Sequence, residues 1–112
     1  MKMTVPVVPV AHVEQASAFY RDELGFAVMF QEGDYVGVNR DNAWLHLDGV
    51  VNKGAGLVTA RIELSGVDEL YAEYEPRGVV DPNEPLHEFP WAKQFSVLDL
   101  DGNRVTFVQM KS

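Results

Sequence analysis

The sequence predicts an α+β fold in which one domain of 112 residues is built from two similar βαβββ modules. The order strand, helix, strand, strand, strand occurs twice, with an offset of about 54 residues. The segments Phe19–Phe26 and Leu70–Val79 are similar to each other. In each, tyrosine is the second residue and glycine is the residue before the last. Two such half-sheets are expected to curl around a shared cleft.

The boundary between the modules lies where periodicity stops. Residues 49–56 contain three glycines and show no regular apolar spacing, which is typical of a linker. We therefore expect a first module over about residues 4–48 and a second over about residues 57–110 of a single domain, residues 1–112.

The first module is expected to begin with an edge strand. Residues 5–10 are mostly β-branched, but Pro6 and Pro9 lack the N–H group that a central strand needs. Apolar residues at helical spacing predict a helix from about Val13 to Leu24, ended by Gly25. Three strands are expected to follow, and they cover residues 26–31, 35–39 and 43–48.

The second module repeats this order. We expect a strand over residues 57–64, a helix over residues 67–74, a short strand at residues 79–80 and a proline-rich loop over residues 81–90. A hairpin closes the chain, because apolar and polar residues alternate on both sides of Asp101-Gly102, a favoured turn pair. Asp99 is placed to accept hydrogen bonds from backbone N–H groups of that turn.

Composition narrows the classes of partner. Nine basic residues face seventeen acidic ones, and the net charge of −8 argues against nucleic acids and anionic membrane surfaces. An acidic protein favours a cationic ligand, although such charge also simply maintains solubility. The absence of cysteine excludes disulfides and thiolate sites, and the N-terminus resembles neither a signal peptide nor a membrane span, so a cytoplasmic location is expected.

Four segments together resemble a known family. They read VPVVPVAHVEQASAFYRDELGF, GDYVGVNRD, GVDELYAEY and PWAKQFSVLDLDGNRVTFV. In this order they are similar to the bleomycin-resistance, or bleomycin-binding, branch of the vicinal-oxygen-chelate (glyoxalase) superfamily. The resemblance implies a homodimer of paired βαβββ modules, with ligand clefts between the subunits and an exchanged N-terminal strand.

The resemblance also argues against a metal centre. The four positions that hold metal ligands in the superfamily's metal-dependent enzymes correspond here to Val5, His46, Thr59 and Thr106. Valine cannot ligate a metal, and threonine is a poor ligand for the metals concerned. We therefore expect no metal, no cofactor and, since no other catalytic constellation stands out, no catalytic residue.

Strand parity and the resemblance together predict the cleft lining. Positions 46, 59 and 106 and their second neighbours along each strand are expected to share its face. The resemblance implies that Phe30, Tyr35 and Trp91 occupy the aromatic positions that, in this branch, flank the planar tail of bleomycin. The predicted ligand-binding residues are Phe30, Tyr35, Trp44, His46, Arg61, Glu63 and Trp91. Core packing remains the alternative for each aromatic residue, and an internal ion pair remains the alternative for Arg61 and Glu63.

Together, these expectations predict a non-catalytic protein. It would sequester a planar, cationic, bleomycin-type antibiotic in an aromatic, acidic cleft at a dimer interface. Six acidic residues are expected around its mouth: Glu32, Asp34, Asp48, Glu63, Glu84 and Glu88. The first alternative is a metal-free binding protein for another small molecule or toxin, which Tyr35, Trp44 and Arg61 favour because they depart from the branch pattern. The second alternative is a superfamily enzyme, either a lyase or a dioxygenase. No nucleic acid and no membrane partner is expected.

Overall fold

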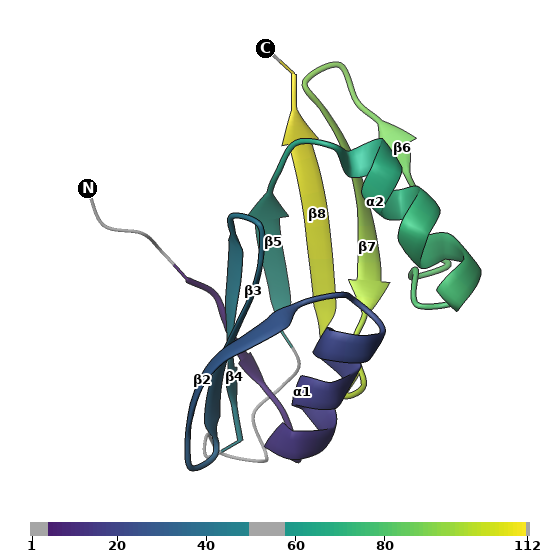
Figure 1. Cartoon of the computed structure of the whole chain (residues 1–112). Coiled ribbons are helices and arrows are strands. Elements are labelled where there is room, and N and C mark those ends of the chain that lie inside the picture. The colour runs from purple at the N-terminus through teal and green to yellow at the C-terminus, as the bar shows by residue number, and fades with distance from the viewer. Residues whose placement is uncertain (1–4, 50–57, 112) are drawn as a thin grey trace.

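The computed structural model describes residues 5–49 and 58–111 and contains two four-stranded sheets (Figure 1). The first module comprises β1 (Val7–Pro9), α1 (Val13–Asp22), β2 (Ala27–Glu32), β3 (Tyr35–Arg40) and β4 (Ala43–Asp48). The second comprises β5 (Thr59–Glu63), α2 (Val67–Tyr74), the 3₁₀ turn η1 (Glu75–Arg77), β6 (His87–Glu88), β7 (Ala92–Leu98) and β8 (Arg104–Met110). The expected α+β fold of two βαβββ modules is thereby confirmed.

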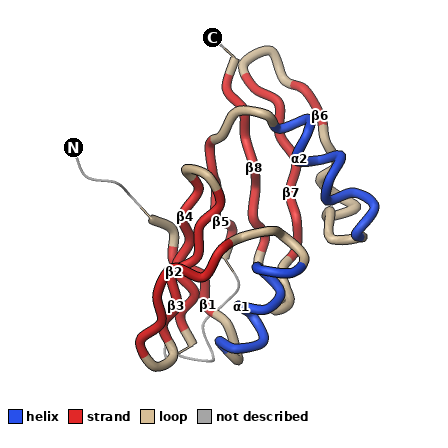
Figure 2. The backbone as a smooth tube through the Cα atoms, in the orientation of Figure 1, coloured by secondary structure: helices blue, strands red, loops and turns tan. Residues whose placement is uncertain are grey.

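The two sheets share one topology. Their strand orders are β1-β4-β3-β2 and β5-β8-β7-β6. In the first sheet β1 runs parallel to its neighbour β4, and in the second β5 runs parallel to its neighbour β8. Figure 2 shows both helices along the same side of the strands. A parallel first strand requires a crossover connection, and here α1 and α2 supply it.

The edge strand β1 is short, as its prolines predict. Among the described strands it pairs with β4 alone, with Val7 opposite His46, and the backbone N–H of His46 donates to the Pro6 carbonyl at 3.0 Å. Exchange of this strand between protomers remains an expectation. Of the expected linker, residues 49–56, the structure describes only Gly49. The rest of the linker lies outside the described residues.

One expected element is wrong. Residues 79–80 do not form a strand; Val80 makes only an isolated bridge to Val97. The short partner of β7 is instead β6, which lies inside the proline-rich segment and pairs His87 with Gln94. β6 consists of two polar residues in a proline-rich segment, so apolar spacing does not report it.

A single apolar core joins both modules. The strand residues facing the helices are buried, and so are the side chains of Tyr20 and Tyr74. Tyr20 packs edge-on against Phe26, and the ring of Tyr74 lies 5.8 Å from that of Phe107. The helices thus cover one face of each sheet; on the opposite face Trp44 and His46 of β4 remain half-buried, whereas Ser96 of β7 and Thr106 of β8 are buried.

The turn between β7 and β8 is organised by the buried carboxylate of Asp99. It accepts four hydrogen bonds of 3.1 Å or less: the backbone N–H groups of Asp101 and Asn103 donate to Oδ1, and the Tyr20 hydroxyl and the Asn103 side-chain amide donate to Oδ2. Burial raises the pKa of Asp99, and the hydrogen bonds from Asn103 and Tyr20 oppose that rise. The donors therefore offset part of the cost of burying this charge.

Asn103 extends this network to the first strand of each module. Its side-chain amide donates to the Pro9 carbonyl at 2.8 Å, and its Oδ1 accepts from the backbone N–H of Val58 at 3.0 Å. Burial, with the nearby Asp99 charge, raises the pKa of the Tyr20 phenol well above its usual range, so this hydroxyl remains a donor at neutral pH. One turn thus ties α1, β1 and the entry to β5 together.

A second contact between the modules centres on Arg40 at the end of β3. Its guanidinium donates two hydrogen bonds of 2.6 Å to the carboxylate of Glu73 on α2, and one of 2.8 Å to the Leu24 carbonyl. The Tyr74 hydroxyl donates to the same carbonyl at 2.5 Å. Gly25 makes this approach possible, because a Cβ there would lie 2.5 Å from Arg40 Nη1.

The Arg40–Glu73 pair predicts an acid-sensitive contribution to stability. The hydrogen bonds from Arg40 lower the pKa of Glu73, so its contribution is present above the unfolded pKa and is lost as the pH falls through the folded pKa. Glu73→Gln is expected to lower the free energy of unfolding at pH 7 by about 1 kcal/mol. The difference from wild type should shrink below about pH 4.

Urea unfolding at a series of pH values measures this difference. Glu75→Gln, an exposed position near the same end of α2, is the control and should stay within about 0.5 kcal/mol of wild type at pH 7. A Glu73→Gln deficit that is constant from neutral to acid pH would contradict the assignment.

Candidate ligand-binding surface

The sheet face that the helices leave uncovered carries most of the predicted residues. Along β4, Ala43, Leu45 and Leu47 are buried toward the helices, while Trp44 and His46 alternate with them and are half-buried. Side chains of alternate strand residues point to opposite faces. Trp44 and His46 therefore share the uncovered face, as strand parity predicts.

Phe30, Tyr35 and His46 form one aromatic cluster on this face. The rings of Phe30 and Tyr35 are 6.3 Å apart and nearly parallel, with 22° between their planes. The His46 ring meets both edge-on, at 5.4 Å from Phe30 and 5.3 Å from Tyr35. The Tyr35 hydroxyl also lies 2.9 Å from His46 Nδ1, so a hydrogen bond holds the two rings together.

Backbone geometry makes room for this cluster. The register between β2 and β3 shifts between Val28 and Phe30, so that Phe30 lies opposite Gly37. A Cβ at Gly37 would be 2.1 Å from a carbon of the Phe30 ring. The ring of Phe30 therefore packs directly on the glycine backbone, which no other residue type would allow without moving it.

The hydrogen bond between Tyr35 and His46 defines what the cluster offers a ligand. In the tautomer with the proton on Nε2, the Tyr35 hydroxyl donates to Nδ1 and the Nε2–H group remains a donor. The cluster then combines apolar ring surface with one directed hydrogen-bond donor. This combination is typical of small-molecule binding sites.

Arg61 and Glu63 extend the uncovered face onto β5. Both are exposed and alternate with the buried Ala60 and Ile62. In the part of the chain that the structure describes, no ion pair joins Arg61 to Glu63, so the alternative of an internal pair is wrong. Exposed charges two residues apart on one strand remain accessible to a ligand.

Trp91 lies elsewhere, at the tip of the β6–β7 hairpin. Its side chain is 57% exposed and stacks on Phe89. Among residues 5–49 and 58–111, no ring contact joins Trp91 to the aromatic cluster. One chain therefore brings Phe30, Tyr35 and His46 together but does not bring Trp91 to them. The sequence analysis missed Phe89, although its spacing of two from Trp91 was visible.

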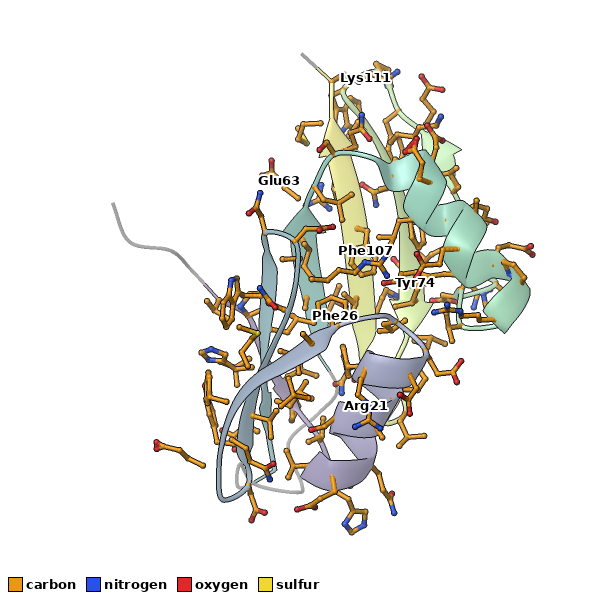
Figure 3. The ribbon with its side chains drawn as sticks, in the orientation of Figure 1. Arg21, Phe26, Glu63, Tyr74, Phe107 and Lys111 are labelled. Atoms are coloured by element: carbon orange, nitrogen blue, oxygen red, sulfur yellow. The ribbon has the colours of Figure 1, made fainter. Side chains whose placement is uncertain are left out.

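A separate recess of about 380 Å³ lies between the modules. Phe26, Leu70 and Phe107 line it, together with Glu63 from the predicted set. The two-residue turn between β3 and β4, Asp41 and Asn42, also lines it. Figure 3 labels Phe26, Glu63 and Phe107.

The fold and the uncovered aromatic face define a protein of the vicinal-oxygen-chelate class, in which paired βαβββ modules present one sheet face to a ligand. The chain belongs to the glyoxalase superfamily, because the model of the family described as "Glyoxalase superfamily protein" matches residues 1–112. Bleomycin resistance proteins of Geobacillus stearothermophilus and Staphylococcus aureus are 29% identical to it over 128 residues, with 97% of each chain covered. The resemblance to this branch is thereby confirmed.

Solved structures show the same relationship. The bleomycin-binding protein from bleomycin-producing Streptomyces verticillus, complexed with copper(II)-bleomycin, is 29% identical, with a TM-score of 0.75 over 96% of this chain and 94% of that chain. The bleomycin resistance determinant encoded on transposon Tn5 has a TM-score of 0.79 at 17% identity over the whole of both chains. Lactoylglutathione lyase from Agrobacterium tumefaciens has a TM-score of 0.75 at 19% identity over 97% of this chain and 94% of that chain, so an enzyme shares the fold.

The residues at the superfamily's metal positions do not fit a metal. Of Val5, His46, Thr59 and Thr106 only His46 is a good ligand, and the buried Thr106 hydroxyl is hydrogen-bonded to Ser96 at 2.8 Å. The described residues contain no group of three or more His, Cys, Asp or Glu side chains arranged to hold a metal ion. Neither described helix is long and apolar enough to cross a bilayer.

Proposed function

We propose that this protein sequesters a planar, cationic, bleomycin-type antibiotic, without catalysis, in a cleft formed between two protomers. The observation that carries the proposal is the preformed cluster of Phe30, Tyr35 and His46 on an uncovered sheet face. The bleomycin-binding and bleomycin-resistance proteins among its relatives support the choice of ligand.

Aromatic stacking supplies the affinity in this proposal. Each favourable ring pair contributes roughly 0.5–1.5 kcal/mol beyond the burial of apolar area, and a cation over a ring adds about 0.5–2 kcal/mol. The cluster is held in place by Gly37 and by the Tyr35–His46 contact before any ligand arrives. Little ordering free energy is then lost on binding.

The acidic residues supply attraction for a cation. The strand register places Tyr35 between Glu32 on β2 and Asp48 on β4, and Asp34 precedes it in the turn. Three carboxylates thus surround the cluster within a chain of net charge −8. Such a field raises the rate of encounter with a cationic ligand and weakens with added salt.

A second copy of the chain completes the cleft. Val7, Val28, Met29 and Phe30 are large apolar side chains left exposed in the single chain, at 39–51% of their surface. Val28, Met29 and Phe30 follow one another on β2, and Val7 lies on β1 at the opposite edge of the sheet, so both edges offer exposed apolar surface of the kind that marks an interaction site. In the proposed dimer, Trp91 of one protomer faces the aromatic cluster of its partner, and the two rings enclose the ligand.

Titration calorimetry with bleomycin tests the proposal. The expected result is binding at micromolar concentration or below, with one bleomycin per chain, weakened by higher salt concentration. Gel filtration of the same sample is expected to show a dimer. The absence of heat at high micromolar bleomycin, or elution as a monomer, contradicts the proposal.

Arg61 favours one alternative ligand class. It is exposed on the uncovered face, and no described carboxylate lies within ion-pair distance of it. A planar anion would pair with this guanidinium. A thermal-shift screen that compares planar anions with planar cations separates the two: stabilisation by anions alone, abolished by Arg61→Gln, would favour another metabolite or toxin.

A further inference from the structure

The β6–β7 hairpin carries a stack of three rings. His87 belongs to β6, Phe89 follows this strand, and Trp91 lies with Pro90 in the two-residue turn before β7, so their ring contacts place the three side chains together. The rings of Phe89 and Trp91 are parallel within 6° at 5.2 Å, and the His87 ring meets Phe89 edge-on at 4.7 Å. His87 is itself fixed, because its Nδ1–H group donates to the Pro85 carbonyl at 2.7 Å.

The backbone beneath Trp91 is held from two sides. Across the turn, the N–H group of Phe89 donates to the Ala92 carbonyl at 2.7 Å. From beyond the end of β8, the N–H group of Lys111 donates to the Trp91 carbonyl at 2.9 Å. Because the main chain is held, the indole of Trp91 can move only by rotation about its side-chain torsions. The contact with Phe89 limits this rotation.

Phe89 covers one face of the indole, yet Trp91 remains 57% exposed. The exposed surface is therefore the opposite face and the ring edges. The charged side chains nearby are paired with each other, Lys111 with Glu88 and Lys93 with Asp68, the latter at 2.7 Å. Within the described residues, no cation is placed over the free face of the indole.

We propose that Phe89 is a positioning residue that holds Trp91 in a ligand-ready orientation, so that a planar aromatic ligand stacks on one face of Trp91 only. This inference rests on the proposed function, since it describes how that site receives its ligand. Phe89 does not touch the ligand; it acts by removing the alternative orientations of the indole. A ring that is already ordered loses less conformational entropy when the ligand binds.

The test compares Phe89→Leu, which removes the ring, with Phe89→Tyr, which keeps it. Phe89→Leu is expected to raise the dissociation constant for bleomycin about three- to tenfold, the range that corresponds to the coupling of one aromatic pair. Phe89→Tyr should bind as wild type does. In a Trp91→Ala background, Phe89→Leu should have no further effect, because its influence passes through the indole.

The free protein supplies a readout that needs no ligand. In the NMR spectrum, the heteronuclear NOE of the Trp91 indole N–H group, assigned with Trp91→Phe, should fall in Phe89→Leu because the ring becomes mobile, and should keep its wild-type value in Phe89→Tyr. If wild-type protein fails to bind bleomycin, the proposed function falls, and the positioning role is judged by this signal alone. An unchanged heteronuclear NOE of the indole, wild-type affinity in Phe89→Leu, or a full additional loss in the Trp91→Ala background overturns the inference.

Discussion

Asp99→Ala is expected to lower the free energy of unfolding by about 3 kcal/mol at neutral pH. The carboxylate is 7% exposed and accepts hydrogen bonds from Tyr20, Asp101 and Asn103. Removing it leaves these donors without their acceptor in a buried turn, and each unsatisfied donor costs roughly 1–3 kcal/mol before water or rearrangement compensates. Urea unfolding followed by circular dichroism measures the change.

Asp22→Ala is the matched control for this prediction. Asp22 also accepts hydrogen bonds, but from its exposed neighbour Arg21, and its side chain is 59% exposed. Its replacement should change the free energy of unfolding by no more than about 0.5 kcal/mol. If Asp99→Ala were as mild as this control, the turn would not be the link between the modules that its hydrogen bonds describe.

Trp91→Ala is expected to raise the dissociation constant for bleomycin at least about tenfold, or about 1.4 kcal/mol, with little effect on folding. Trp91 is exposed at a hairpin tip, so its removal leaves no cavity in the core. It removes the ring on which the ligand stacks. Titration calorimetry gives the affinity, and thermal unfolding confirms that the fold is retained.

Leu100→Ala controls for the loss of exposed apolar surface. Leu100 is 56% exposed, close to the value for Trp91, but lies in the β7–β8 turn away from the proposed cleft. It should leave bleomycin affinity unchanged within about twofold. Equal losses for Leu100→Ala and Trp91→Ala would show that general surface character, and not ring stacking, sets the affinity.

Local sequence signals predicted most of the fold. The expected ranges of β4 and α2 agree with the structure, because strict alternation and helical spacing report directly on which side of an element is buried. The Asp101-Gly102 turn and the role of Asp99 as an acceptor were also predictable, since turn chemistry is local.

Pairing between strands accounts for what was not predictable. β6 forms because His87 pairs with Gln94. The strand expected at residues 79–80 does not form, because Val80 makes only an isolated bridge to Val97. The same holds for the candidate site: parity places His46 on the cleft face and Tyr35 was expected at a strand end near its mouth, but their contact depends on the β3–β4 register. Likewise, Arg61 and Glu63 are exposed because the helices cover the other face of their sheet.

The proposed cleft takes its aromatic cluster from one protomer and Trp91 from the other, and a mixed dimer tests this directly. Tyr35→Ala and Trp91→Ala chains are co-expressed with different affinity tags, and the heterodimer is isolated through both. One of its clefts then contains both substitutions, and the other contains neither. Calorimetry should find weak binding to each variant homodimer, but one bleomycin per heterodimer with wild-type affinity. A heterodimer without any wild-type site would contradict a cleft shared between protomers.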